Sequence, residues 1–120
     1  MNLPSSSSEL CAINGTATPK YAARLTPQQI ADLHKHVPDW AVNELNGTLQ
    51  LQREFACENF VAAMTFASRI AELAEASDHH PALLVQYGSV SVSWWSHSID
   101  GLHLNDFIAA AKTDRVFTNL

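Results

Sequence analysis

The chain has 120 residues, a length that fits one domain with a hydrophobic core of its own. Apolar residues make up 47% of the chain and charged residues 16%, an ordinary globular composition. Twelve acidic residues outnumber seven scattered basic ones, which gives a net charge of −5. Nucleic acids and anionic membranes are bound through clustered Lys and Arg, so we expect neither as a direct partner.

The first residues contain no basic stretch followed by an apolar one, so no secretory signal is visible. The most apolar stretch, residues 60–67, is too short to span a bilayer. Cys11 and Cys57 are expected to be free thiols rather than a disulfide. Together these features predict a cytoplasmic protein.

Residues 1–20 contain four consecutive serines, two prolines and one glycine. This composition predicts a flexible tail or a loosely docked arm, ahead of a domain formed by residues 21–120. The domain opens on Thr26-Pro27, an N-cap followed by a proline suited to the first helical position. Apolar residues then recur at helical spacing until Pro38, which ends the helix.

Two strand-like segments, residues 40–45 and 48–55, flank Asn46-Gly47, the strongest short hairpin signal. In the second segment apolar and polar residues alternate, which predicts one buried and one wetter face of a sheet. A long helix follows over about residues 58–76. Its apolar stripe has helical period and comprises Phe60, Ala63, Met64, Ala67, Ile70, Ala71 and Ala74.

Two further strands are predicted over residues 83–87 and 90–95, joined at Gly88-Ser89, and a last helix begins near residue 104. Val90, Val92 and Trp94 share one face of the second of these strands. Trp95 and His97 fall on the opposite face if the strand continues that far. The order helix, strand, strand, helix, strand, strand, helix predicts an α+β fold. We expect a four-stranded antiparallel sheet with three helices on one face, and an uncovered face or edge strand suited to oligomer contacts.

The residues suited to chemistry are His79-His80, His97 and Asp106. Pro81 forces the long helix to end by His79, so both imidazoles lie where side chains can point into a cleft. His97 follows the hairpin that starts just beyond them, and that hairpin can return its end to its beginning. Imidazole titrates near neutral pH, so two or three histidines around one pocket can both deliver and remove a proton.

Each of these residues also has a structural explanation. His79 as a cation would be stabilised by the C-terminal end of the helix dipole, and Asp106 could be an N3 carboxylate that stabilises the last helix. His80 and His97 could be loop residues without a task, and Glu75 a solvated surface charge. The three histidines with a carboxylate could instead hold zinc, but adjacent histidines seldom chelate one ion and no regular ligand pair is present.

One wider pattern resembles a known family. Glu75-x-x-x-His79-His80-Pro81 is followed after five residues by Tyr87, after nine more by His97, and after eight more by Asp106. This arrangement is similar to that of the pterin-4a-carbinolamine dehydratases, over roughly residues 25–115.

The resemblance implies an enzyme that dehydrates 4a-hydroxytetrahydrobiopterin to quinonoid dihydrobiopterin, without metal or other cofactor, in the recycling of tetrahydrobiopterin for aromatic amino acid hydroxylases. It also implies a homo-oligomer, either dimer or tetramer. It makes His79 and His97 the candidates for proton transfer and His80 the candidate for substrate orientation. The remaining candidates for substrate binding are Glu75, Asp78, Pro81, Trp95, Ser96 and Asp106.

The chain departs from the family pattern at three points. Ser96 stands where the family usually has Thr and keeps the hydroxyl, the pair Trp94-Trp95 puts a large ring where a smaller residue is common, and His103 is a weaker N-cap than the usual Thr or Ser. A second function class stays open on the same fold: a non-catalytic binding protein, either a transcriptional dimerisation cofactor or an enzyme-assembly chaperone.

Overall fold

The predicted order of helices and strands is present in the computed structural model, which describes residues 2–120. The elements are α1 (Ser7–Ala12), α2 (Pro27–His34), β1 (Ala41–Leu45), β2 (Thr48–Ala56), α3 (Phe60–Ser77), β3 (Ala82–Gln86), β4 (Ser89–Trp94), the 3-10 helix η1 (His97–Ile99) and α4 (Leu104–Thr118). The α+β class and the order from α2 onward are confirmed, and α1 and η1 are additional. No helix within residues 2–120 is both long and apolar enough to cross a membrane.

The start of α2 has the local chemistry that the sequence predicts. The Thr26 hydroxyl accepts a hydrogen bond from the backbone N–H of Gln29, and the Gln29 side chain accepts one from the N–H of Thr26. This reciprocal pair satisfies two backbone donors that the helix leaves free. The helix ends at His34, four residues before Pro38, where the sequence predicts the boundary, although Val37 is still buried.

The four strands form one antiparallel sheet in the order β1-β2-β4-β3. At the β1–β2 turn Asn46 and Gly47 both have positive φ angles, 52° and 80°, as the hairpin turn requires. Leu51 lies opposite Trp94 on the buried face, whereas Gln52 lies opposite Ser93 on the other. The sheet therefore has the predicted buried face and a wetter face.

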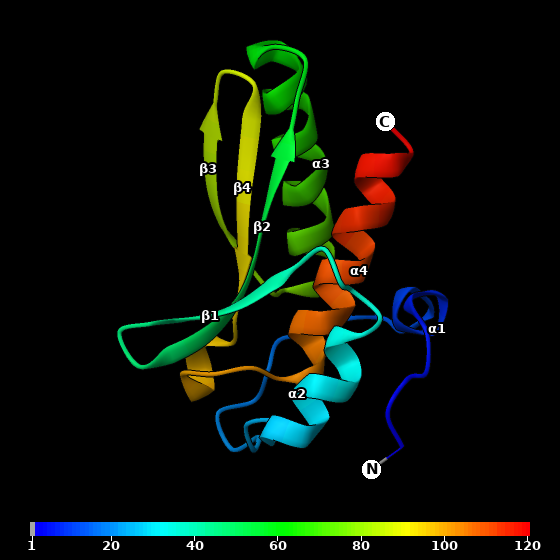
Figure 1. The fold of residues 1–120 in the computed structure, drawn as a ribbon, viewed down its shortest axis with the longest axis vertical. Helices are drawn as coiled ribbons and strands as arrows, with labels where there is room; N and C mark the ends of the chain where they lie inside the picture. The colour runs from blue at the N-terminus through cyan, green and yellow to red at the C-terminus, as the bar shows by residue number, and fades with distance from the viewer. Residues whose placement is uncertain (1) are drawn as a thin grey trace.

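Helices α3 and α4 lie side by side across the buried face of the sheet (Figure 1). Phe55 of β2 forms the centre of an aromatic cluster there. Its ring centroid is 4.9 Å from that of Phe66 on α3, 4.9 Å from that of Phe117 on α4 and 5.8 Å from that of Trp40. Such pairs add to the stabilisation that burial of the rings provides.

The buried face of α3 is turned relative to the predicted stripe. Phe66 is fully buried, but Phe60 and Met64 are 48% and 46% exposed, and Ala71 is exposed as well. The side chains that face the core repeat at positions 63, 66, 67, 70 and 74, a face centred about 40° away from the one predicted at 100° per residue. Periodicity alone does not show which side of the helix meets the sheet, so it placed three residues that face solvent on the core side.

The N-terminal segment forms a docked arm, defined here as residues 2–22. The side chain of Ser6 caps α1 by accepting a hydrogen bond from the N–H of Glu9, and Leu10 is fully buried. Helix α1 lies against α4 (Figure 1). Beyond it, Gly15 approaches Ser77 of α3, since a Cβ at Gly15 would lie 3.3 Å from that of Ser77. The division of the chain into a tail of residues 1–20 and a domain of residues 21–120 stays a prediction.

Candidate active site

The end of α3 sends His79 and His80 in different directions. Asp78 ends the helix in the left-handed region, with φ 50° and ψ 41°, and the N–H of His79 donates a hydrogen bond to the carbonyl of Ala74. This αL cap turns the chain sharply, and Pro81 then keeps His80 extended. As a result His79 is only 7% exposed, whereas the side chain of His80 is 54% exposed.

His79 is held on two sides. Its Nε2 lies 2.6 Å from Oδ1 of Asp106, and its ring stacks on that of Trp94, with centroids 5.4 Å apart and planes 18° from parallel. Trp94 is itself fixed, because its Nε1–H donates to the hydroxyl of Thr113 on α4. The imidazole therefore has a defined plane and one defined hydrogen-bond partner.

Asp106 is fully buried and accepts hydrogen bonds at both carboxylate oxygens. Oδ1 faces His79, and Oδ2 accepts from the hydroxyl of Ser96 at 2.8 Å and from the backbone N–H of His103 at 2.9 Å. The contact with His103 is half of a capping box at the start of α4. Asp106 thus combines two roles that the sequence left as alternatives: it stabilises the helix as its N3 residue and orients His79.

The Asp106 carboxylate decides which nitrogen of His79 carries a proton. An ionised carboxylate has acceptors only, so Nε2 of His79 must donate to it. In the neutral imidazole the other nitrogen, Nδ1, then has a free lone pair. This is the arrangement in which a carboxylate fixes the tautomer of a general base.

His103 completes the surroundings of Asp106. Its Nδ1 accepts a hydrogen bond from the backbone N–H of Asn105 at 3.1 Å, so it acts as the N-cap of α4. Burial lowers the pKa of His103 below its usual value of 6.5, which the nearby Asp106 carboxylate partly offsets. Burial thus favours the neutral form of the ring, which is the form that can accept the capping hydrogen bond.

His80 and Glu75 form a pair on the exposed side of the same helix end. Nε2 of His80 lies within hydrogen-bond distance of the Glu75 carboxylate, and both side chains are more than half exposed. Asp78 is exposed and Pro81 is half-buried. These four residues, all predicted to bind substrate or take part in catalysis, precede or follow His79 closely in sequence.

His97 does not lie on β4, so the alternation of buried and exposed side chains along that strand does not extend to it. The strand ends at Trp94 because Ser96 and Gly101 pair across a tight loop, and the chain turns into η1 at His97. His97 is exposed, and its ring centroid is 4.3 Å from that of Trp95. His97 therefore lies on a short helix rather than on a strand. It directly follows Ser96, whose hydroxyl donates to Asp106.

Hydrogen bonds connect three of the predicted residues directly, whereas others form separate pairs nearby in sequence. His79, Ser96 and Asp106 form one buried hydrogen-bond network, with the pair His80–Glu75 and the pair Trp95–His97 flanking it in sequence. Within residues 2–120 no hydrogen bond links any two of the three imidazoles.

Sequence analysis gave no role in the site to two residues that contact the network. Trp94 could have been recognised, since the alternation along β4 assigns it to the buried face. Thr18 lies in the arm, where nothing in the sequence indicates a partner.

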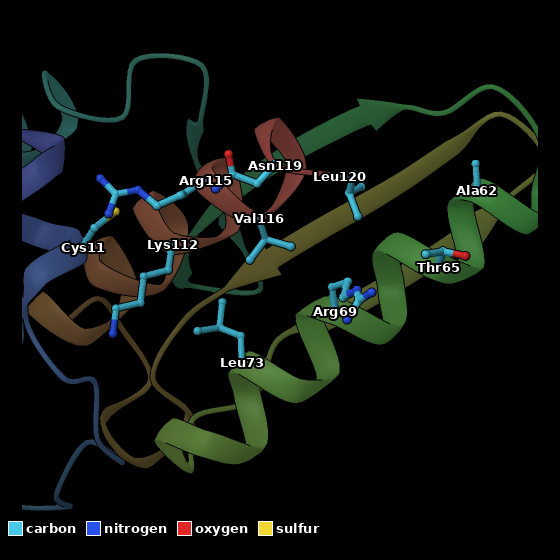
Figure 2. Close-up of a pocket in the computed structure, with 10 residues that line it drawn as sticks. All are labelled: Cys11, Ala62, Thr65, Arg69, Leu73, Lys112, Arg115, Val116, Asn119 and Leu120. Carbon is cyan, nitrogen blue, oxygen red and sulfur yellow. The ribbon is translucent and has the colours of Figure 1, made fainter.

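A wide groove lies away from this network (Figure 2). It has a volume of about 760 Å³ and runs between α3 and α4 on the side away from the sheet, with Leu73 and Val116 on its floor and Arg69, Lys112 and Arg115 around it. The cavity that touches His79, of about 10 Å³, is too small for any substrate.

Comparison with known proteins identifies the family. The family model described as pterin 4 alpha carbinolamine dehydratase matches residues 23–116. A curated relative from Gloeobacter violaceus, described as putative pterin-4-alpha-carbinolamine dehydratase 1, is 50% identical over 101 residues, which cover 84% of this chain and 87% of the relative. A crystal structure of a protein from Brucella melitensis, described as transcriptional coactivator/pterin dehydratase, superposes with a TM-score of 0.70 at 28% identity. The match covers 78% of this chain and 98% of that one.

The chain belongs to the pterin-4a-carbinolamine dehydratase family, and the resemblance inferred from its motif is confirmed. It is an enzyme of the carbon–oxygen hydro-lyase class, as predicted.

Proposed function

We propose that the chain removes water from 4a-hydroxytetrahydrobiopterin to give quinonoid dihydrobiopterin, by histidine acid–base catalysis and without a metal. The product is the form that is reduced again to serve aromatic amino acid hydroxylases. The observation that carries the proposal is the buried His79–Asp106 pair, because it holds an imidazole in a fixed plane with one nitrogen free.

The reaction needs one proton delivered and one removed. Hydroxide is a poor leaving group, so an acid protonates the 4a-hydroxyl as its bond to carbon breaks and water leaves. A base then takes a proton from a nitrogen of the resulting cationic ring. His79, with Nε2 donating to Asp106, supplies the base through Nδ1. His97, exposed beside Trp95, supplies the acid, and the exposed His80, paired with Glu75, orients the substrate.

The other predicted site residues fit this arrangement as supports. Ser96 donates to the carboxylate of Asp106, and the ring of Trp95 offers an apolar surface next to His97. Asp78 and Pro81 shape the turn that separates His79 from His80. General acid–base catalysis of this kind contributes about 10²–10⁴-fold, which suffices for a dehydration that also proceeds without a catalyst.

The test is steady-state kinetics on His79→Ala, His97→Ala and the double variant, with generated 4a-hydroxytetrahydrobiopterin as substrate and the uncatalysed rate subtracted. We expect kcat to fall by about 10²-fold or more in each single variant, with a smaller change in KM. His80→Ala should raise KM more than it lowers kcat. His36→Ala, a histidine outside the network, is the matched control and should leave both constants unchanged.

Near-wild-type kcat in a double variant whose circular dichroism is native would contradict the mechanism. It would favour the alternative, a binding protein on the same fold. The description of the Brucella melitensis protein as a transcriptional coactivator as well as a dehydratase motivates that alternative. Elemental analysis showing stoichiometric zinc, with activity lost to a chelator, would contradict the metal-free reaction.

We also propose that the protein is a homo-oligomer, a dimer or a tetramer, in the cytoplasm. Apolar side chains that one chain leaves exposed support this: Phe60, Val61 and Met64 at the start of α3, and Leu84 on the edge strand β3. Light scattering at micromolar concentration should give a multiple of the 13.2 kDa chain mass. A mass of one chain would contradict the proposal.

A further inference from the structure

The N-terminal arm reaches the buried network at one residue, Thr18. The family model begins at residue 23, so the arm lies outside the part of the chain that defines the family. Thr18 is nonetheless 8% exposed, less than most of the arm, and its hydroxyl lies 2.9 Å from that of Ser96. Ser96 in turn donates to Asp106, the partner of His79.

The direction of each hydrogen bond in this network follows from counting protons. A serine hydroxyl has one proton, and Ser96 gives its proton to Asp106, so the bond between Thr18 and Ser96 must be donated by Thr18. The Thr18 oxygen accepts in its turn from the amide Nδ2–H of Asn105 at 3.1 Å. The order of donation is therefore Asn105 to Thr18, Thr18 to Ser96 and Ser96 to Asp106, where it meets the bond from His79.

Thr18 also contacts the segment that carries His97. Its backbone carbonyl accepts a hydrogen bond of 2.7 Å from the hydroxyl of Ser98, the residue after His97 in η1. One residue of the arm is thus bonded to the network that orients one catalytic histidine and to the short helix that bears the other.

We propose that Thr18 is a positioning residue of the active site: its hydroxyl fixes Ser96 and, through Ser96, the orientation of Asp106 and His79. The proposal rests on the catalytic role of His79 proposed above. Without the Thr18 hydroxyl, Ser96 loses the one donor to its hydroxyl oxygen among residues 2–120 and is free to turn its own proton away from Asp106. The Asp106 carboxylate then has one hydrogen bond fewer to fix its orientation, and the His79 imidazole bonded to it is less well oriented.

The main alternative is that the arm only adds stability. Two variants of the full chain separate the possibilities. Thr18→Val keeps the size and β-branching of threonine and removes the hydroxyl, while the carbonyl that bonds Ser98 is retained; Thr18→Ser keeps the hydroxyl. Thr65→Val is the matched control, because Thr65 is exposed on α3 and its hydroxyl donates to the carbonyl of Val61 in its own helix, away from the network.

We expect Thr18→Val to lower kcat about 10-fold, less than the 10²-fold that a misplacement of about 1 Å can cause, with KM changed by less than about twofold. Thr18→Ser should recover kcat to within about twofold of wild type, and Thr65→Val should match wild type. Unchanged kcat in folded Thr18→Val would overturn the proposal, and so would an equal loss in Thr18→Ser. If Thr18→Val does not fold, Thr18→Ala replaces it with the same expected outcome.

A second readout is independent of turnover. Nitrogen-detected NMR of ¹⁵N-histidine protein reports which nitrogen of His79 is protonated and how firmly that proton is held. We expect a protonated Nε2 in wild type and in Thr18→Ser, and a broadened or shifted signal in Thr18→Val. An unchanged signal in Thr18→Val would overturn the positioning role. If wild type lacked dehydratase activity, the proposed function would fail, while this measurement would still decide whether Thr18 controls His79.

Discussion

Replacement of Asp106 by Asn tests the chemistry of the site with almost no change of shape. The carboxylate accepts from His79 at Oδ1, and from Ser96 and the N–H of His103 at Oδ2. In Asp106→Asn the amide oxygen must take the Oδ2 position, since both groups there donate. The amide NH₂ then faces Nε2 of His79, which can accept only if the imidazole moves its proton to Nδ1. All the bonds can form, but the tautomer of His79 is inverted.

The size of the effect follows from this exchange. Hydrogen bonds to a charged group contribute about 1.5–3 kcal/mol and neutral ones about 1 kcal/mol, so loss of the charge across the three bonds should destabilise the fold by about 2 kcal/mol. For a chain of this length that corresponds to a Tm lower by roughly 8 °C. The catalytic loss should be larger, about 10²–10⁴-fold in kcat, because a base with the wrong tautomer has no lone pair to offer.

The assay compares kcat, KM and urea unfolding for Asp106→Asn and for Asp114→Asn. Asp114 is the matched control on the same helix α4, where its carboxylate accepts from Trp40 and Arg53, away from the network. We expect Asp114→Asn to lower stability and leave kcat unchanged. A folded Asp106→Asn with wild-type kcat would refute the reasoning, and so would a His79 that keeps its proton on Nε2 in the NMR spectrum of that variant.

Three further predictions concern stability. Because burial lowers the pKa of His103 in the folded state below 6.5, the unfolded chain binds a proton first as the pH falls. The stability that this residue contributes is therefore present in full above about pH 6.5 and is lost as the pH falls through the lowered pKa. Urea unfolding between pH 8 and 5 should show a weaker pH dependence in His103→Ser, and equal dependence would contradict the assignment. Asp114→Ala leaves the indole of Trp40 and the guanidinium of Arg53 without their acceptor and should lower the unfolding free energy by about 2 kcal/mol; a loss near zero in urea unfolding would be inconsistent with these bonds. Leu10→Ala should cost about 2–5 kcal/mol if the arm is docked in solution, whereas a cost below about 0.5 kcal/mol would mean that it is a free tail.

Sequence patterns predicted the fold where local chemistry decides it. Thr26-Pro27 begins α2 and Asn46-Gly47 makes the hairpin turn, because caps and positive-φ turns depend on a few adjacent residues. Other features depend on contacts between distant residues. The face of α3 that is buried is set by the sheet, so Met64 was assigned to the core and Phe66 was not.

The same distinction applies to the site. The end of the long helix by His79 could be predicted, because Pro81 restricts the residue before it. The left-handed turn at Asp78, which separates the two imidazoles, was not predicted. The bond from His79 to Asp106 spans 27 residues, and periodicity contains no information on it; only the family motif brought the two residues together. The sequence left open whether the last strand reaches His97, because the alternation along β4 gives no sign of the Ser96–Gly101 pairing that follows its end.

The contacts of Thr18 have a consequence for how the protein folds. Its three polar partners, Ser96, Ser98 and Asn105, are 78, 80 and 87 residues away in sequence. Contacts of such separation close large loops, whose entropy loss makes them slow to form, whereas the hairpins and helices of the domain close short ones. We therefore expect the sheet and its helices to assemble first and the arm to dock last. In a refolding experiment, the tryptophan signal of the core should recover before full dehydratase activity does.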